Sequence, residues 1–140
     1  MNVVDAVEFA RHHTKSVFVT TRRDGRPQLS NVLHWIAADG LIRISITADR
    51  AKYHNLRRDP WAAVHVASDD FWRYTVLEGS VDLSDVATRP DDETVDELVA
   101  YYRAMNGDHD HWDEYRAAMV RDLRVVARVR PERAYGVLRH

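Results

Sequence analysis

Short runs of β-branched and aromatic residues, joined by tight Asp-Gly turns, are the feature that most constrains the fold of this chain. Ser16–Thr21 has the sequence SVFVTT, and a returning run follows over Pro27–Ile36. A third run covers Leu41–Thr47, and Asp-Gly pairs at 24–25 and 39–40 separate the three runs. Asp-Gly between apolar runs is a β-hairpin signal, because the turn needs residues that adopt positive φ. Successive antiparallel hairpins are therefore predicted.

Alternation within these runs predicts which side chains face the core. The isoleucines at 42, 44 and 46 share one face of their strand, and Ser45 and Thr47 share the other. We expect the isoleucine face to be buried. On Pro27–Ile36, Gln28, Ser30 and His34 alternate toward one side, which leaves that face partly polar.

The remaining elements follow from periodicity and from start and stop residues. Further strands are predicted over Trp61–Ala67, Tyr74–Leu83, Arg124–Val129 and, more briefly, Ala134–Leu138. Helices are predicted over Val3–Ala10, Asp49–Asp59, Pro90–Asn106 and His111–Asp122. This pattern predicts a mainly β fold with helices, a small barrel of six to seven antiparallel strands and about four helices. No linker or repeat divides residues 1–140, so a single domain is expected.

Composition excludes several classes of protein. The chain has no cysteine, and its formal net charge of -2 gives no general attraction to nucleic acid or to an anionic membrane. No apolar run approaches the ~20 residues that span a bilayer, and no signal peptide opens the chain, so a cytoplasmic location is expected. His109-Asp110-His111 lacks metalloprotease spacing, and no metal site is predicted. No nucleophile elbow or dinucleotide-binding glycine motif is present, so the catalytic residues stay unknown.

Arg50 and Lys52 are the most informative charges in the sequence. They fall at the start of the predicted helix Asp49–Asp59, directly after the strand that carries Ser45 and Thr47. Cations oppose the dipole at a helix N-terminus unless an anion lies there. One interpretation is a phosphate cradle of backbone N–H groups, a guanidinium and an ammonium. The other is a solvated basic helix face continued by Arg57 and Arg58, and the spacing alone does not separate the two.

Two weaker signals accompany this one. The polar face of Pro27–Ile36 either faces solvent or a subunit interface, or hydrogen-bonds a planar heterocycle. The bunched aromatics of Phe71–Tyr74 either pack in the core or an interface, or wall a pocket for a ring.

Two longer motifs carry a family resemblance. They are D-G-R-P-Q-L-S-N-V over Asp24–Val32 and R-A-K-x-x-N-L-R-R-D-P over Arg50–Pro60. With Trp72, Tyr74 and the Glu78-Gly79 pair, they resemble the pyridoxamine 5'-phosphate oxidase-like superfamily, and within it the small branch that depends on coenzyme F420. The resemblance extends over nearly the whole chain. The arginine- and histidine-bearing C-terminal motif of true pyridoxamine phosphate oxidases has no match here.

The resemblance implies a split β-barrel that forms a homodimer, with two cofactor sites at the subunit interface. It implies that Gln28, Ser30 and Asn31 run along the cofactor ring and that Trp72 and Tyr74 of the other subunit close the site. The phosphate would be held by residues of the strand end and the helix start, namely Ser45, Thr47, Arg50, Lys52 and Asn55. These expectations favour the phosphate-cradle interpretation.

The implied activity is hydride transfer between F420 and a small organic acceptor, in which the cofactor supplies the chemistry and the protein binds and orients it. Two alternatives stay open. One is an FMN-dependent oxidase or reductase on the same fold, and the other is a non-catalytic protein that carries F420 or FMN. The physiological acceptor is not predicted.

Overall fold

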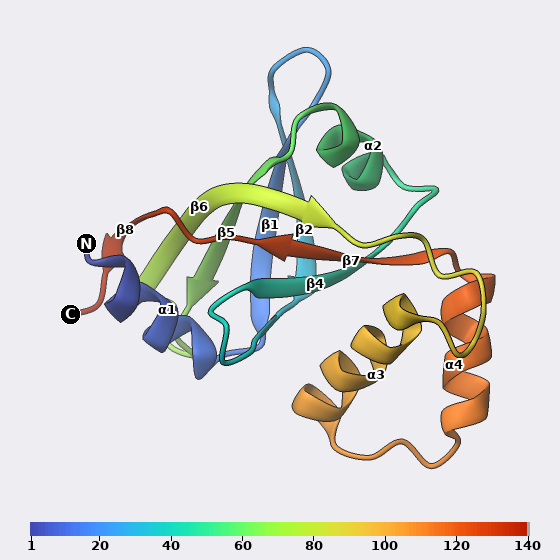
Figure 1. Cartoon of the computed structure of the whole chain (residues 1–140). Helices are drawn as coiled ribbons and strands as arrows, with labels where there is room; N and C mark the ends of the chain where they lie inside the picture. Colours follow the sequence, from blue (N-terminus) through green and yellow to red (C-terminus); the bar gives the residue numbers. More distant parts are fainter. Residues whose placement is uncertain (140) are drawn as a thin grey trace.

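The computed structural model describes residues 1–139, which fold into an antiparallel sheet with four helices around it (Figure 1). The strands are β1 (Lys15–Thr21), β2 (Pro27–Leu33), β3 (Trp35–Ile36), β4 (Ile42–Thr47), β5 (Trp61–Ala67), β6 (Tyr74–Leu83), β7 (Arg124–Val129) and β8 (Arg133–Val137). The helices are α1 (Val3–Arg11), α2 (Ala51–Arg58), α3 (Glu93–Asn106) and α4 (Trp112–Arg121).

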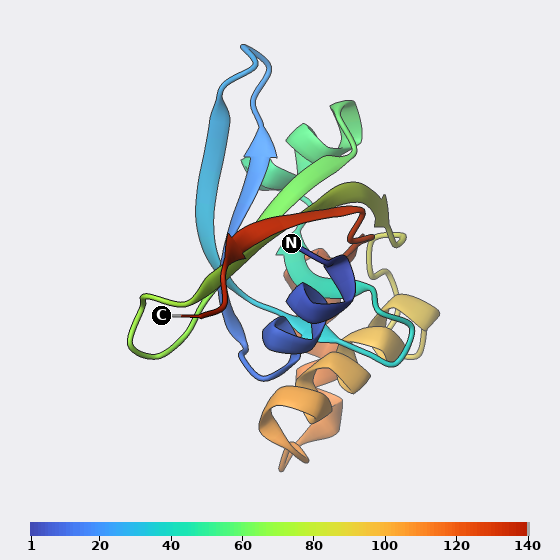
Figure 2. The same ribbon diagram turned by 90° about the vertical axis from the view of Figure 1, so that its left-hand side faces the viewer.

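All strand pairs are antiparallel, in the order β2-β1-β5-β6-β7-β4-β3, and β8 pairs with β6. Strand β6 has ten residues and is therefore long enough to pair with two strands in succession. One part of β6 pairs with β8, and its end pairs with β7. The sheet curls so that β2 and β4, which are not hydrogen-bonded to each other, come into contact (Figures 1 and 2). The predicted mainly β split barrel is confirmed.

The barrel interior is built from the residues that alternation assigned to it. Ile42, Ile44 and Ile46 are each at most 1% exposed, and they pack with Phe18 and Leu77 in one cluster. Burial of one such side chain stabilises the fold by about 1.5–3 kcal/mol. The small residues of α1 let that helix approach the barrel closely, because Ala6 and Ala10 are fully buried.

The strand predicted over Pro27–Ile36 is wrong in one respect, since it breaks at His34 into β2 and β3. His34 is 1% exposed, and its ring nitrogens lie 3.0 Å from Ser16 Oγ and 2.9 Å from the carbonyl oxygen of Ala10. Burial lowers the pKa of His34 below 6.5. The turned-in ring marks the point where the chain stops pairing with β1 and begins to pair with β4.

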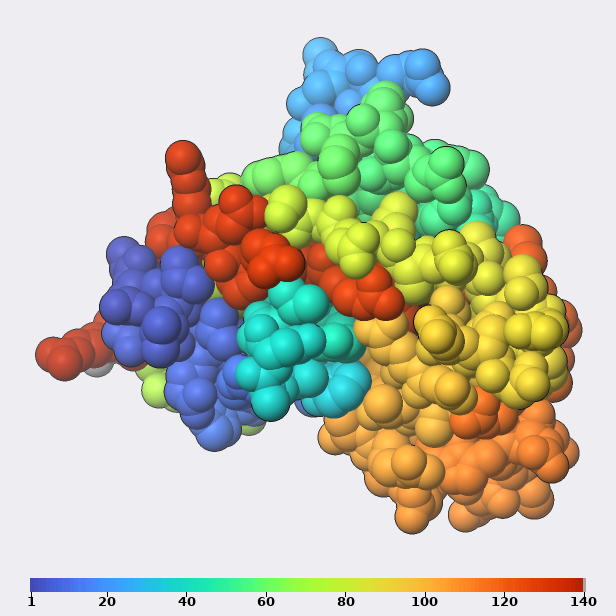
Figure 3. Space-filling model, viewed as in Figure 1, coloured from blue at the N-terminus to red at the C-terminus, as the bar shows by residue number. Residues whose placement is uncertain are grey.

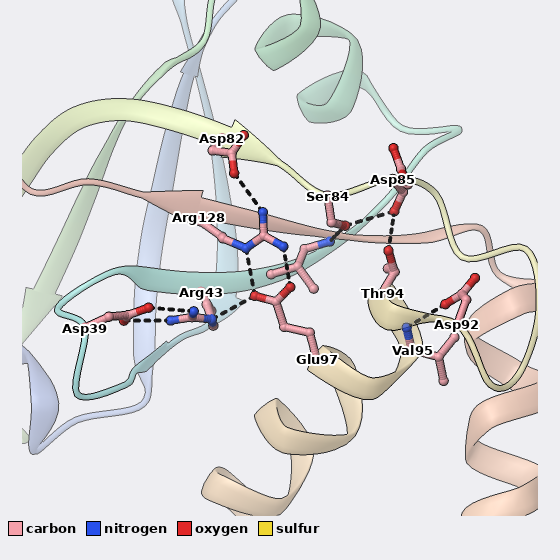
Figure 4. Close-up of polar contacts among 11 residues, drawn as sticks. Asp39, Arg43, Asp82, Ser84, Asp85, Asp92, Thr94, Val95, Glu97 and Arg128 are labelled. Atoms are coloured by element: carbon pink, nitrogen blue, oxygen red, sulfur yellow. Dashed lines mark hydrogen bonds and ion pairs between the residues drawn. The ribbon is translucent and has the colours of Figure 1, made fainter.

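Helices α3 and α4 form a hairpin beside the barrel (Figure 1), whereas the tip of the β1–β2 hairpin, in light blue, projects away from the rest of the molecule (Figure 3). Helix α3 begins as predicted near Pro90–Asp92, because the Asp92 side chain caps it by accepting a hydrogen bond from the Val95 N–H at 2.8 Å. Glu97 then ties α3 to the sheet through Arg43 of β4 and Arg128 of β7 (Figure 4).

No helix within residues 1–139 combines the length and the apolar character that crossing a membrane requires.

Candidate functional site

Helix α2 begins with two cations and no acidic residue. Arg50 is the N-cap in an extended conformation, its side chain makes no capping hydrogen bond, and the first turn contains no carboxylate. Lys52 lies in that turn. Because the N-terminal end of a helix already carries partial positive charge, this arrangement is unfavourable without an anion.

Arg124 adds a third cation from a distant part of the sequence. It lies directly opposite Thr47 in the β4–β7 register, and its Nη1 is 3.4 Å from Ser45 Oγ. Its Nε is buried and has no hydrogen-bond partner within the described residues. A buried donor without a partner costs about 1–3 kcal/mol, so the hydrogen-bonding capacity of the Arg124 side chain is not fully used within the chain.

These cations border a cavity of about 480 Å³, which we call the cation cavity. Its walls come from β2, from β4 and β7, from the start of α2, and from the α3–α4 hairpin. The lining residues are Asn31, Val32, Leu33, Ser45, Ile46, Thr47, Arg50, Lys52, Tyr101, Tyr102, Tyr115, Met119 and Arg124. None of them is acidic.

The electrostatics of the cation cavity favour an anion. Burial lowers the pKa of Lys52 below 10.5, and the positive charges of Arg50 and Arg124 lower it further. An anion bound among the three cations would reverse the last two effects, since opposite charge favours the protonated ammonium. The same residues offer the hydroxyl groups of Ser45 and Thr47 as additional donors.

The two other arginines on this face of β4 and β7 are neutralised within the chain. Arg43 and Arg128 share the carboxylate of Glu97, and each also pairs with an aspartate, Asp39 at 2.7 Å and Asp82 at 2.8 Å (Figure 4). Arg124 lies on the same face of β7 but has no such carboxylate among the described residues. On this face of β4 and β7, the arginine without a carboxylate partner is therefore the one at the end nearest α2.

Aromatic residues of the helical hairpin form the opposite wall. The Tyr101 hydroxyl donates to the carbonyl oxygen of Leu33 at 2.9 Å, and the Tyr115 hydroxyl donates to that of Leu98 at 2.9 Å. Burial raises the pKa of both tyrosines to about 12, so both are neutral donors at pH 7. The wall is therefore fixed in position and uncharged.

The structure brings together half of the residues predicted to bind a cofactor. Asn31, Ser45, Thr47, Arg50 and Lys52 all line the cation cavity. Their role as ligands remains a prediction, but their convergence is a property of the fold.

Five other predicted site residues lie elsewhere. Asn55 is 7% exposed, and its Nδ2 donates to Gln28 Oε1 at 2.8 Å, so both side chains are engaged between α2 and the barrel strands. Ser30 does not line the cavity. Trp72 and Tyr74 lie at the β5–β6 connection, where Trp72 is 61% exposed and Tyr74 stacks on His65. In this chain, none of the five borders the cation cavity.

Sequence reasoning missed Arg124 and the tyrosines at 101, 102 and 115. No local motif marks them, because they join the site through the β4–β7 register and the packing of the α3–α4 hairpin. The one available signal was that Arg124 opens a predicted strand.

No group of three or more metal-ligating side chains occurs in the part of the chain that the structure describes. In the histidine pair of the α3–α4 loop, His109 Nδ1 accepts a hydrogen bond from the backbone N–H of His111 at 2.8 Å.

A protein-family model matches nearly the whole chain. The model described as pyridoxamine 5'-phosphate oxidase matches residues 4–138.

Solved structures share the fold over nearly the whole chain. A conserved hypothetical protein from Mycobacterium tuberculosis is 21% identical with a TM-score of 0.75, and the match covers 98% of this chain and 84% of that one. A protein named F420 reductase is 24% identical with a TM-score of 0.69, covering 91% and 94%. The heme storage protein HutZ from Vibrio cholerae is 14% identical with a TM-score of 0.69, covering 97% and 95%.

Proposed function

The chain belongs to the pyridoxamine 5'-phosphate oxidase family, and from that premise we propose that it is an oxidoreductase that transfers hydride between coenzyme F420 and a small organic acceptor. One observation carries the proposal. Arg50, Lys52 and Arg124 border a single cavity that no carboxylate lines, and the Nε of Arg124 has no hydrogen-bond partner among the described residues.

The residues of the cation cavity fit the phosphate group of such a cofactor. A guanidinium binds phosphate oxygens through its directed N–H groups, and an ammonium adds a point charge. The free N–H groups at the start of α2 supply further donors. In this proposal the guanidinium groups of Arg124 and Arg50 and the ammonium of Lys52 hold the phosphate, and Ser45 and Thr47 donate hydroxyl hydrogen bonds to it.

The rest of the cavity suits a flat, partly apolar ring system. Tyr101, Tyr102 and Tyr115 offer aromatic surface on one side, and the strand residues Asn31–Leu33 offer backbone groups and a mixed face on the other. A reduced deazaflavin supplies hydride when it is bound. The protein residues then need only to hold the ring and exclude water, which agrees with the lack of a recognisable catalytic motif.

The preference for F420 over FMN rests on the resemblance of the two sequence motifs to the F420-dependent branch. The likeness to a protein named F420 reductase agrees with it, although at 24% identity that likeness concerns the fold. Competition titration of both cofactors against the purified protein tests the preference. Tighter binding of F420 is expected, whereas equal or reversed affinities would favour an FMN enzyme. Binding of F420 without turnover of any acceptor would favour a carrier.

We also propose that the protein acts as a homodimer with the cofactor sites at the subunit interface. Strand register places one continuous row of residues across the outer face of five strands. From β2 to β8 the row is Asn31, Val17, His65, Val76 and Tyr135.

Apolar side chains on this outer face are exposed in the single chain. Leu29 is 61% exposed, Tyr135 52% and Val137 44%, and Phe71 and Trp72 lie at one end of the same sheet. Several exposed apolar side chains on one sheet face favour an interaction site. A second copy of the chain would cover this surface and would bring its loop 69–74 toward the neighbouring site. Light scattering at micromolar concentration tests this, because a dimer has twice the 16.2 kDa mass of the chain.

A further inference from the structure

A second and larger cavity, of about 820 Å³, lies on the outer side of β1 and β5. We call it the outer cavity. Its lining combines an apolar wall with polar and titratable groups, and none of the three cations of the cation cavity belongs to it. The lining residues are His13, Thr14, Lys15, Ser16, Val17, Asn31, Val32, Leu33, His65, Ala67, Ser68, Asp69 and Phe71.

The two cavities meet at β2. Asn31, Val32 and Leu33 line both of them, so this short piece of strand separates the cation cavity from the outer cavity. A molecule in the outer cavity would therefore adjoin a ring that lies along the end of β2. The volume of 820 Å³ is within the range of about 300–1,000 Å³ found for small-molecule sites.

An unusual backbone conformation presents an aromatic ring at this cavity. Phe71 has φ +80°, and its side chain is 63% exposed. Positive φ is a genuine outlier for a bulky residue and is unfavourable unless the surroundings enforce it. Here the loop is tightly closed, because Phe71 N–H donates to Ser68 O at 2.8 Å and Ser68 N–H donates to Arg73 O at 2.7 Å.

Within the single chain, the fold gains nothing evident from a phenylalanine at this position, and in the proposed dimer the second copy would close the outer cavity beside this ring. Asparagine or glycine adopts positive φ with less strain, and neither would expose an aromatic ring to solvent. Strained backbone that presents an exposed side chain to a cavity points to function. The ring of Phe71 also lies edge-on to that of Trp72, at 5.3 Å between centroids.

We infer that the outer cavity is the compartment for the hydride acceptor, and that Phe71 is a specificity-determining wall of it. This inference rests on the proposed function. The chemistry of the lining selects a flat, partly apolar molecule that carries a carbonyl or carboxylate oxygen. Phe71, Val17 and Leu33 offer apolar contact.

Lys15 is the group that faces the oxygen of the acceptor. It makes no ion pair with any of residues 1–139, and it borders the cavity together with the imidazoles of His13 and His65. Asp69 is the one carboxylate in the lining, and its negative charge disfavours an anionic group next to it, so the oxygen of the acceptor is expected beside Lys15. Two-electron reduction of a conjugated carbonyl adds hydride to a carbon and a proton, drawn from water, to the oxygen, and it leaves the cofactor oxidised.

The test uses 8-anilinonaphthalene-1-sulfonate as a flat, anionic fluorescent probe, titrated into the full chain with and without F420. Phe71→Asn should weaken probe binding about threefold to tenfold, the range expected for loss of one aromatic contact. It should also raise the Tm by about 2–4 °C, because asparagine tolerates positive φ. Phe71→Leu keeps the strain and loses the ring, so it should weaken binding without raising the Tm. Lys15→Ala should weaken probe binding as well.

Matched variants separate this inference from the proposed function. Tyr135→Ala removes another exposed aromatic residue from the same sheet face but not from the cavity, and should leave probe affinity unchanged. Lys52→Ala should weaken F420 binding and leave the probe bound. Unchanged probe affinity in Phe71→Asn would overturn the inference, and so would a loss of F420 affinity as large as that of Lys52→Ala. Conversion of a dimer to a monomer by Phe71→Asn would assign the ring to subunit contact instead. If the wild type binds the probe but not F420, the proposed function fails while the cavity stands.

Discussion

Arg43 on β4 and Arg128 on β7 lie directly opposite each other, and the carboxylate of Glu97 accepts hydrogen bonds from both, each at 2.8 Å from Nε (Figure 4). Two like charges facing each other across a sheet would be destabilising, so the carboxylate allows the pair to exist. Four residues before Arg128 on the same strand, Arg124 lacks a comparable partner among the described residues. This difference separates an arginine pair that is neutralised within the fold from an arginine that we propose binds the cofactor phosphate.

Replacement of Lys52 by alanine should weaken F420 binding about tenfold to a hundredfold. Loss of one charge-assisted hydrogen bond to phosphate is worth about 1.5–3 kcal/mol. The Tm of the cofactor-free protein should stay the same or rise, since Lys52 sits unfavourably near two other cations. Fluorescence titration and thermal unfolding measure the two quantities. Arg89→Ala, which removes an exposed cation that lines neither cavity, is the control for cofactor affinity. Wild-type affinity in Lys52→Ala would remove the phosphate assignment.

Arg124→Met and Arg128→Met should have opposite signatures, although both remove an arginine from the same face of β7. Arg124→Met removes a buried donor that has no partner, so stability should hold while F420 affinity falls at least tenfold. Arg128→Met leaves Glu97 with one arginine fewer and should cost about 1–3 kcal/mol of unfolding free energy. Urea unfolding and cofactor titration of both variants measure these two effects. Equal changes in stability and in F420 affinity would refute the distinction between Arg124 and Arg128.

Acid should weaken the attachment of α3 through Glu97. Burial favours a raised pKa for this carboxyl, but its hydrogen bonds with Arg128 and Arg43 outweigh burial and hold the pKa below 4.5. A carboxyl whose pKa is lower in the folded protein stabilises the fold above its unfolded pKa, and this contribution is lost as the pH falls through the folded value. The Tm of the wild type should therefore fall more steeply below pH 4.5 than that of Glu97→Gln. Parallel curves for the two proteins would show that Glu97 contributes nothing to the acid response.

Asn55→Ala should destabilise the fold more than it weakens cofactor binding. The side chain is buried, and its Nδ2 donates to Gln28 Oε1 at 2.8 Å and to Thr20 Oγ1 at 3.2 Å. Its removal leaves buried acceptors unpaired, at a cost of about 1–3 kcal/mol. Thermal unfolding and F420 titration measure the effects. A loss of F420 affinity equal to that of Lys52→Ala, with an unchanged Tm, would instead indicate that Asn55 binds the cofactor, as the family resemblance implied.

Local patterns in the sequence determined much of this structure without reference to any tertiary contact. The two Asp-Gly pairs end in Gly25 and Gly40, whose φ values of +84° and +79° are those that the turns require. The alternating isoleucines of β4 are buried as predicted. Arg50 and Lys52 were recognisable as a candidate anion site, because the conflict between their charges and the helix dipole is a matter of a few neighbouring residues.

The tertiary structure alone decided which other residues join that site. Arg124 reaches the cation cavity because β4 pairs with β7 in one register, and a slip of one residue would turn it to the core face. The same long-range packing turned His34 inward, which split a predicted strand. It also placed Asn55 where its side chain donates a hydrogen bond to Gln28. Register and the placement of the α3–α4 hairpin depend on contacts between residues far apart in the chain. The sequence pattern therefore shows the periodicity of each element, but it does not show which elements contact each other in the fold.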